Sequence, residues 1–216
     1  MRRDEDIGAS IQYYLIHGLD KKRKRFMEIQ FRHAGVPSEN VNWILSPNVG
    51  DPLPRDICDN PTLPESLMAI SYKHYLCLEK IVASGEPVAV IVEDNVEFLS
   101  ALPQKIAEYL RDLPENWDIL FDSDFYGWKY EEGPLLPGVS VYEKSNESSQ
   151  QCAGATKGVH FYMLSQKAAK TLYENYLPFG DGPDHHLNKI IMRNSLRCFW
   201  AEPPNVHKIN RPSSWR

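Results

Sequence analysis

A continuous apolar run at residues 87–92, Pro-Val-Ala-Val-Ile-Val, constrains the fold of this chain more than any other feature. An apolar run without polar alternation is typical of a central strand of a parallel sheet, buried on both faces. The run ends abruptly in three polar residues, Glu93, Asp94 and Asn95. Open parallel α/β sheets bind their ligands outside the carboxyl ends of the strands. The sequence therefore predicts an α/β fold with a ligand site directly after residue 92.

Strand and helix patterns alternate along the rest of the chain. Short apolar runs predict further strands at 11–16, 41–45, 117–121, 139–142, 158–164 and 197–200. Amphipathic spacing with caps and stops predicts helices at 20–34, 66–83, 102–113, after Ser165, and at 184–192. Strands that alternate with helices indicate an α/β sandwich with a mainly parallel sheet.

Composition excludes several classes of protein. The net charge of −5 leaves no global basic field for a nucleic-acid backbone. The four cysteines are scattered without a C-x-x-C pair, which predicts reduced thiols and no zinc site. No stretch approaches the roughly 20 apolar residues that span a membrane, and no apolar run follows the polar first residues. We expect a soluble, cytoplasmic protein with no membrane span.

Two acidic clusters compete as the site of a divalent cation. Carboxylates that follow a buried strand suit Mg²⁺ or Mn²⁺, which can bridge the two phosphates of a nucleotide-sugar. One cluster is Glu93-Asp94-Asn95, and the other is Asp122 and Asp124, which has the cleaner D-x-D spacing. Each can also be an ordinary acidic turn whose side chains cap backbone amides. The residues alone leave this choice open.

Six segments of the chain follow one another in the order known from a family of enzymes. They are residues 14–25, 66–74, 89–98, 117–120, 154–165 and 183–185. Together they resemble glycosyltransferase family 25, which includes lipopolysaccharide-synthesis and collagen galactosyltransferases. The resemblance implies a GT-A-type, Rossmann-like α/β/α sandwich. It also implies inverting, metal-dependent transfer of a hexose from a nucleoside diphosphate, with uridine as the preferred base, to a carbohydrate acceptor.

The sequence departs from the family pattern at two places. Asn95 replaces the third acidic residue, so Asp94 becomes the main expected metal ligand. His17-Gly18 stands where an Asn is common. With these departures, the expected ligands of Mn²⁺ or Mg²⁺ are Asp94, Asn95 and His207. The expected donor-binding residues are His17, Arg25, Ser71, Lys73, Glu93, Lys208 and Arg211. The aromatic rings of Tyr126 and Trp128 are the expected acceptor platform, because sugar C–H faces stack on such rings.

An inverting transfer needs a general base for the acceptor hydroxyl. Asp184 is the first candidate, with a helix N-cap as its alternative role, and Asp181 is the second. We expect one domain over residues 1–216, with a donor-binding half at about 8–125 and an acceptor-side half at about 126–216. Two rival functions remain open: a retaining transferase of the same fold, and a catalytically inactive module that binds carbohydrate or nucleotide.

Overall fold

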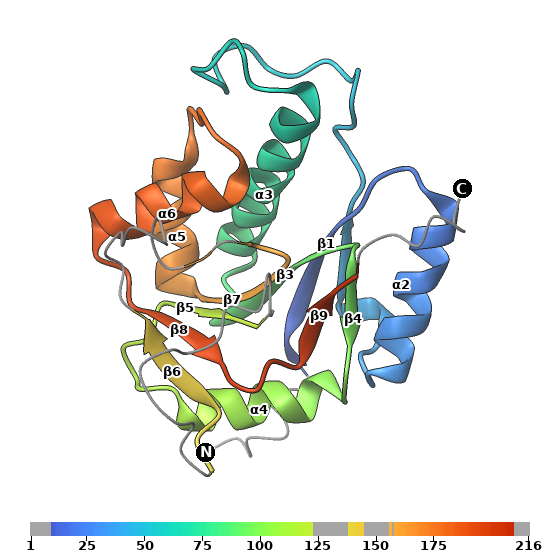
Figure 1. Ribbon diagram of the computed structural model, residues 1–216, viewed down its shortest axis with the longest axis vertical. Helices are drawn as coiled ribbons and strands as arrows, with labels where there is room; N and C mark the ends of the chain where they lie inside the picture. The colour runs from blue at the N-terminus through green and yellow to red at the C-terminus, as the bar shows by residue number, and fades with distance from the viewer. Residues whose placement is uncertain (1–9, 123–137, 145–155, 157, 210–216) are drawn as a thin grey trace.

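The computed structural model describes residues 10–122, 138–144, 156 and 158–209. A seven-stranded sheet forms its centre, in the order β2-β1-β3-β7-β5-β8-β6 (Figure 1). The strands of this sheet are β1 (Gln12–Ile16), β2 (Val41–Ile44), β3 (Val88–Glu93), β5 (Ile119–Phe121), β6 (Val141–Lys144), β7 (Phe161–Ser165) and β8 (Cys198–Ala201). A separate two-stranded sheet pairs β4 (Val96–Phe98) with β9 (Val206–Lys208).

Five of the seven central strands run in one direction. The pairs β2–β1, β1–β3 and β5–β8 are parallel, whereas β7 lies antiparallel between β3 and β5, and β6 lies antiparallel to β8. The prediction of a mainly parallel α/β sheet is therefore confirmed. Because β7 is inserted beside β3, strands from both halves of the chain share one sheet.

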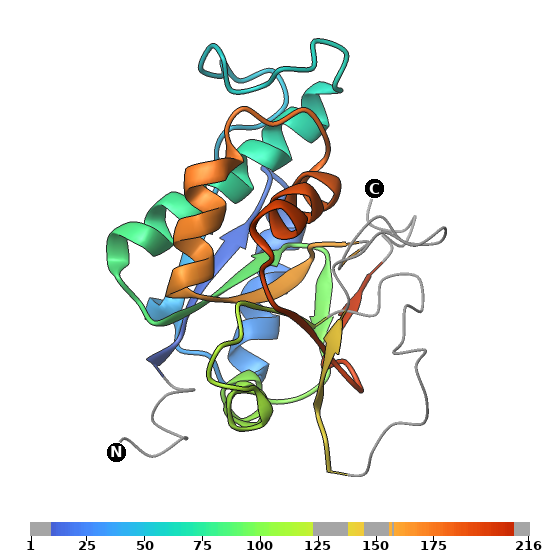
Figure 2. The ribbon, with the colours of Figure 1, turned by 90° about the vertical axis from the view of Figure 1, so that its left-hand side faces the viewer.

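Helices cover both faces of the sheet, as Figures 1 and 2 show. The helices are α2 (Lys21–His33), α3 (Glu65–Ser84), α4 (Leu102–Asp112), α5 (Gln166–Tyr176) and α6 (Pro183–Asn194), with a short 3₁₀ turn at Ser38–Asn40. Alternate side chains of each strand point to opposite faces. In β1, Tyr14 and Ile16 pack with α3, α5 and α6, whereas Tyr13 and Leu15 pack with α2 and α4. The result is the α/β/α sandwich that the sequence predicts.

Local sequence signals account for most of the element boundaries. The side chain of Asp20 accepts hydrogen bonds from the backbone N–H groups of Lys22 and Arg23, so it caps α2 as predicted. Helix α3 ends at Gly85, which takes a left-handed φ of 70° that glycine adopts without steric cost. Ser165 caps α5 through its side chain, again as predicted.

Four expectations about the elements are wrong. Strand β6 lies two residues later than expected, and β7 begins at Phe161 rather than at residue 158. Strands β4 and β9 were not expected, because each has only three residues and is too short to show a periodicity. Helix α6 begins at Pro183 with Gly182 as its N-cap, so Asp184 lies in the first turn and does not cap the helix.

No helix in the described part of the chain is long and apolar enough to cross a membrane. Cys58, Cys77 and Cys198 carry free thiols, and Cys152 lies outside the described residues.

Candidate functional site

The carboxyl ends of β1 and β3 meet at one edge of the sheet. Ile16 is opposite Glu93 in the register, and the N–H of Asp94 donates to the carbonyl of Ile16 at 3.1 Å. A cavity of about 200 Å³ opens at this edge, between the strand ends, α2 and α3. Apart from Ser66, its charged and polar lining residues are His17, Arg23, Asn48, Lys73, Glu93, Asp94 and Asn95. We call this set the edge cluster.

Both carboxylate oxygens of Asp94 bind cationic or N–H groups of the protein itself. Arg23 Nη1 donates to Oδ1 at 2.5 Å, and His17 Nδ1 donates to Oδ2 at 2.7 Å. The backbone N–H of Gly18 also points to Oδ2, at 3.4 Å. The Asp94 side chain is only 9% exposed. A charged pair so well shielded from water is held much more firmly than a pair on the surface.

Glu93 lies at the centre of a buried network with two histidines. Its Oε2 accepts from His160 Nδ1 at 2.6 Å, and its Oε1 accepts from His74 Nε2 at 3.3 Å. The other nitrogen of His74 is 2.8 Å from the hydroxyl of Tyr162. Burial opposes ionisation of Glu93, but the bonds from His160 and His74 outweigh it and hold the pKa of Glu93 well below its usual range. Glu93 is therefore a fixed negative charge whose oxygens already have partners.

Two lysines bring positive charge to the same edge from different elements. Lys73 on α3 donates to the carbonyl of His17 at 2.6 Å and to Asn48 Oδ1 at 3.2 Å. Burial lowers its pKa, while the charge of Asp94 acts in the opposite direction. Burial also lowers the pKa of Lys208 on β9, against the attraction of Glu93 and Asp184. Lys208 is opposite Val96 in the β4–β9 ladder, and the N–H of its neighbour Ile209 donates to the carbonyl of Asn95 at 2.8 Å, so its backbone lies beside the edge cluster.

Asp122, the rival metal residue, anchors the backbone instead. Its Oδ1 accepts from the N–H groups of Asn205 and Val206 at 2.7 and 3.3 Å, and its Oδ2 accepts from the hydroxyl of Tyr109 at 3.0 Å. Burial raises the pKa of Asp122 to about 6. These bonds hold the segment that leads into β9 and thus place Lys208. Asp124, its predicted companion, lies outside the described residues.

The structure places the other predicted catalytic and donor-binding residues in different surroundings. Asp184 in the first turn of α6 has Oδ1 2.9 Å from the N–H of His185. Asp181 is ion-paired with Lys189 and lines a different cavity, of about 250 Å³. Ser71 does not line the edge cavity; its hydroxyl donates to the carbonyl of Asp181 at 3.2 Å and so holds the start of α6 in place.

The structure also places Arg25 and His207 differently from what was expected. Arg25 is exposed on α2, and Arg23 is the arginine that reaches the edge cluster. His207 is paired with Glu97 in the β4–β9 ladder, one residue from Lys208. Because successive side chains of a strand point to opposite faces, the imidazole of His207 and the side chain of Lys208 point to opposite faces of β9. The metal role of His207 stays a prediction without geometric support.

Three expected site residues, Arg211, Tyr126 and Trp128, lie outside the described residues, so their roles stay predictions. Asn95 is within the edge cluster, and its side-chain Oδ1 is buried with no hydrogen-bond partner among the described residues. A buried carbonyl oxygen without a donor costs free energy unless a ligand or water supplies one. Asn95 therefore marks a position where a ligand can donate a hydrogen bond.

Sequence reasoning missed four residues of the edge cluster and its surroundings, namely Arg23, Asn48, His74 and His160, although Arg23 and His74 had a visible signal. Arg23 stands in the first turn of the helix that follows β1, so its side chain points back towards the strand end. His74 interrupts the buried stripe of α3, four residues after Ile70 and three before Cys77. His160 had no such signal, because its contact with Glu93 depends on the antiparallel pairing of β7 with β3.

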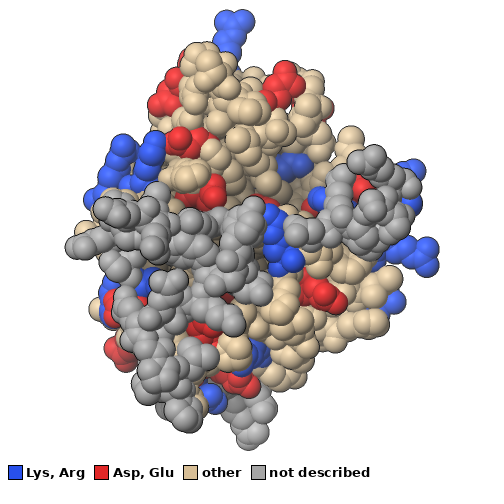
Figure 3. All heavy atoms as spheres, viewed as in Figure 1, with Lys and Arg blue, Asp and Glu red and all other residues tan. Residues whose placement is uncertain are grey.

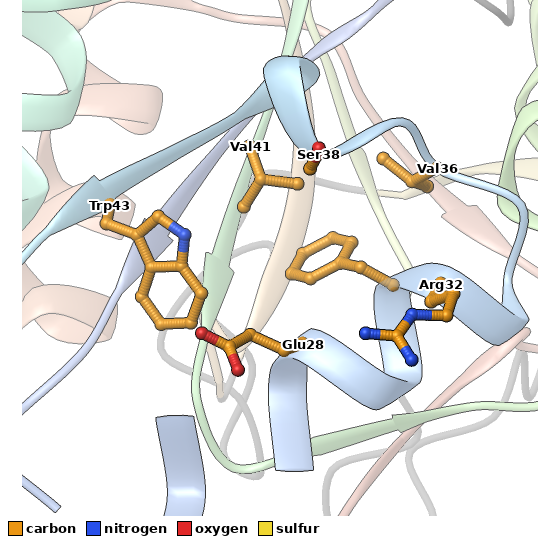
Figure 4. Close-up of a pocket in the computed structure, with 7 residues that line it drawn as sticks. Glu28, Arg32, Val36, Ser38, Val41 and Trp43 are labelled. Carbon is orange, nitrogen blue, oxygen red and sulfur yellow. The ribbon is translucent and has the colours of Figure 1, made fainter. Parts of the chain in front are cut away.

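A larger cavity, of about 400 Å³, lies between α2 and the edge strand β2 (Figure 4). Glu28 and Arg32 of α2 face Val41 and Trp43 of β2 across it. It shares no lining residue with the edge cavity, and its charged lining residues are one acidic, Glu28, and one basic, Arg32. On the face drawn in Figure 3, acidic and basic side chains are interspersed and do not form a field of one sign. The concentration of buried charge at the edge cluster therefore distinguishes it from these surfaces.

Comparisons with known proteins show only remote likeness. No protein-family model matches the chain, and no curated protein matches it. Among solved structures, A197 from STIV is similar with a TM-score of 0.46 and 10% identity, over 94% of this chain and 95% of that chain. The inositol-1-phosphate CTP transferase from T. maritima is similar with a TM-score of 0.44 and 10% identity, over 97% of this chain and 75% of that chain.

An apo UDP-glucose pyrophosphorylase is similar with a TM-score of 0.43 and 12% identity, over 92% of this chain and 76% of that chain. Likeness this weak carries no argument about chemistry, so the function must be inferred from the edge cluster itself.

Proposed function

We propose that this chain is a GT-A-type glycosyltransferase that transfers a hexose from a nucleoside diphosphate, preferably UDP, to a carbohydrate acceptor with inversion. The observation that carries the proposal is the edge cluster. Arg23, Lys73 and the orphaned oxygen of Asn95 line one cavity at the carboxyl ends of β1 and β3. That is where α/β sheets of this type bind nucleotides.

The lining of the edge cavity suits the two ends of such a donor. Apolar side chains, among them Val49 and Ile70, stand beside the charged ones. A nucleobase has flat apolar faces that pack on such side chains, whereas a diphosphate needs fixed cations. Arg23 and Lys73 supply these cations from α2 and α3. Asn95 Oδ1 would accept a hydrogen bond from a hydroxyl of the donor.

The proposed base is Asp184. It lies in the first turn of α6, and its charge acts to raise the pKa of Lys208. An inverting displacement needs a base that accepts the proton of the acceptor hydroxyl, which attacks the side opposite to the leaving diphosphate. A carboxylate in this role typically contributes about 10²–10⁴-fold to the rate.

Titration calorimetry with UDP, UDP-glucose and UDP-galactose tests donor binding, and release of free hexose measures slow donor hydrolysis. We expect UDP to bind and at least one UDP-hexose to be hydrolysed slowly. Sugar binding without any nucleotide binding would instead identify a carbohydrate-binding module and overturn the proposal.

The variant Asp184→Asn tests the base. We expect hydrolysis of the donor to fall by about 10²-fold or more, while the dissociation constant for UDP stays the same. Asp181→Asn is the matched control, because Asp181 belongs to a different cavity and pairs with Lys189. Equal loss of hydrolysis in both variants would refute the assignment of Asp184.

A further inference from the structure

We infer that Arg23, Lys73 and Lys208 neutralise the donor diphosphate in place of a divalent cation, so that the nucleotide binds this chain without metal. The inference rests on the proposed function and concerns how the same site holds its donor. It departs from the metal dependence that the family resemblance implies. Two observations carry it: the carboxylate oxygens of Asp94 and Glu93 already accept hydrogen bonds, and the three cations stand on three different elements.

The residues of the edge cluster do not fit a divalent metal site. In nucleotide sites Mg²⁺ is held by one or two protein carboxylates together with waters and phosphates, so at least one carboxylate oxygen must be available to the ion. Both oxygens of Asp94 already accept from Arg23 and His17, and both oxygens of Glu93 accept from His160 and His74. Among the residues that the structure describes, no three His, Cys, Asp or Glu side chains are grouped so that they could hold a metal ion.

The charged lining leaves no excess of negative charge for a cation. The charged lining of the edge cavity consists of Glu93 and Asp94 against Arg23 and Lys73, with His17 beside them. The two negative and two positive charges cancel, and Lys208, opposite Val96 in the β4–β9 ladder, adds a further positive charge beside the edge cluster. A divalent cation would have to displace Arg23 from a 2.5 Å contact with a shielded carboxylate. A diphosphate, in contrast, meets cations that are already present.

The three cations come from three different elements, and Arg23 and Lys73 line the edge cavity itself. Arg23 is fixed in the first turn of α2, whose N-terminus itself favours an anion. Lys73 is fixed by the carbonyl of His17 and by Asn48. Lys208 is fixed on β9, whose entry is anchored by the buried carboxylate of Asp122.

The bond between Arg23 and Asp94 is part of this arrangement. A guanidinium carries five N–H donors in a rigid fork, so Arg23 can keep its bond to Asp94 and still donate to a phosphate oxygen. Asp94 then acts as a positioning residue for Arg23. Fixed cations aimed at the diphosphate also stabilise the charge that develops on the leaving group during transfer.

Titration of the full chain with UDP, first in EDTA and then in excess Mn²⁺, tests the inference. We expect UDP to bind in EDTA with a dissociation constant within about threefold of that in Mn²⁺, since about 0.6 kcal/mol separates affinities that differ so little. Binding that requires Mn²⁺ would overturn the inference and leave the proposed function standing. Absence of UDP binding in both conditions would overturn the proposed function itself.

Three charge-removing variants identify the cations. In EDTA, Arg23→Gln, Lys73→Met and Lys208→Met should each weaken UDP binding by about tenfold or more, because each removes a charge-assisted hydrogen bond to the diphosphate. Lys22→Met and Arg32→Gln are matched controls on exposed positions of α2.

Circular dichroism melting checks that each variant folds. Should Lys73→Met unfold because Lys73 is buried, Arg23→Gln and Lys208→Met still decide the matter. Unchanged affinity in these two variants would refute the assignment of the cations.

Discussion

Replacement of Asp122 by Asn is expected to stabilise the protein at neutral pH. Asp122 is 1% exposed, and burial raises its pKa from 3.8 to about 6. Between these two values the folded state binds more protons than the unfolded state. The free energy of unfolding therefore falls as pH rises through this window and stays constant above it. The amide introduced by Asp122→Asn would keep a neutral oxygen as acceptor for the N–H groups of Asn205 and Val206 and would carry no buried charge.

The shift of about two pKa units sets the size of the effect. At about 1.4 kcal/mol per unit, the ionised carboxylate costs up to about 3 kcal/mol above pH 6. Urea unfolding of the wild type and of Asp122→Asn between pH 4 and pH 7.5 would measure it. We expect near-equal stability at about pH 4, and a more stable variant at neutral pH.

Asp112 offers a control of opposite sign. Partial burial raises the pKa of Asp112, but the hydrogen bonds from Ser140 and the charge of Arg111 together outweigh burial and leave that pKa below its usual value. Its stabilisation is therefore present at neutral pH and lost as pH falls, so Asp112→Asn should be less stable than the wild type at pH 7. If Asp122→Asn behaves like Asp112→Asn, the bonds from Asn205, Val206 and Tyr109 outweigh burial, and the reasoning about Asp122 is refuted.

Two further substitutions test the edge cluster and the helix that carries Arg23. Glu93→Gln should lower the free energy of unfolding by about 3 kcal/mol at pH 7, because it breaks a buried pair with His74 and His160. The depressed pKa of Glu93 means that this difference is present above about pH 4.5 and shrinks in acid, which urea unfolding at two pH values would show. A pH-independent difference would contradict ionised Glu93. Asp20→Ala should cost about 1 kcal/mol through loss of the α2 cap, measured by thermal melting, and an unchanged melting temperature would contradict the capping role.

Local features of the sequence determined the fold class and the place of the site. The apolar run at 87–92 predicted a buried strand, and the register of β1 with β3 shows it at the centre of the sheet. The cap at Asp20 and the stop at Gly85 predicted helix ends that the structure confirms. These signals are readable because propensity, capping and periodicity act between residues a few positions apart.

Only the tertiary structure decided which charges meet at that site. The contacts of Asp94 with Arg23 and of Glu93 with His160 join residues about 70 positions apart. The sequence singled out Arg25, whereas the rotation of α2 on the sheet brings Arg23 to the strand end. The strand that carries Lys208 exists because β4 pairs with it, and no local pattern predicts such a pairing. The acidic residues after β3 were visible from the start, but their neutralisation by the protein's own cations depends on packing between distant segments.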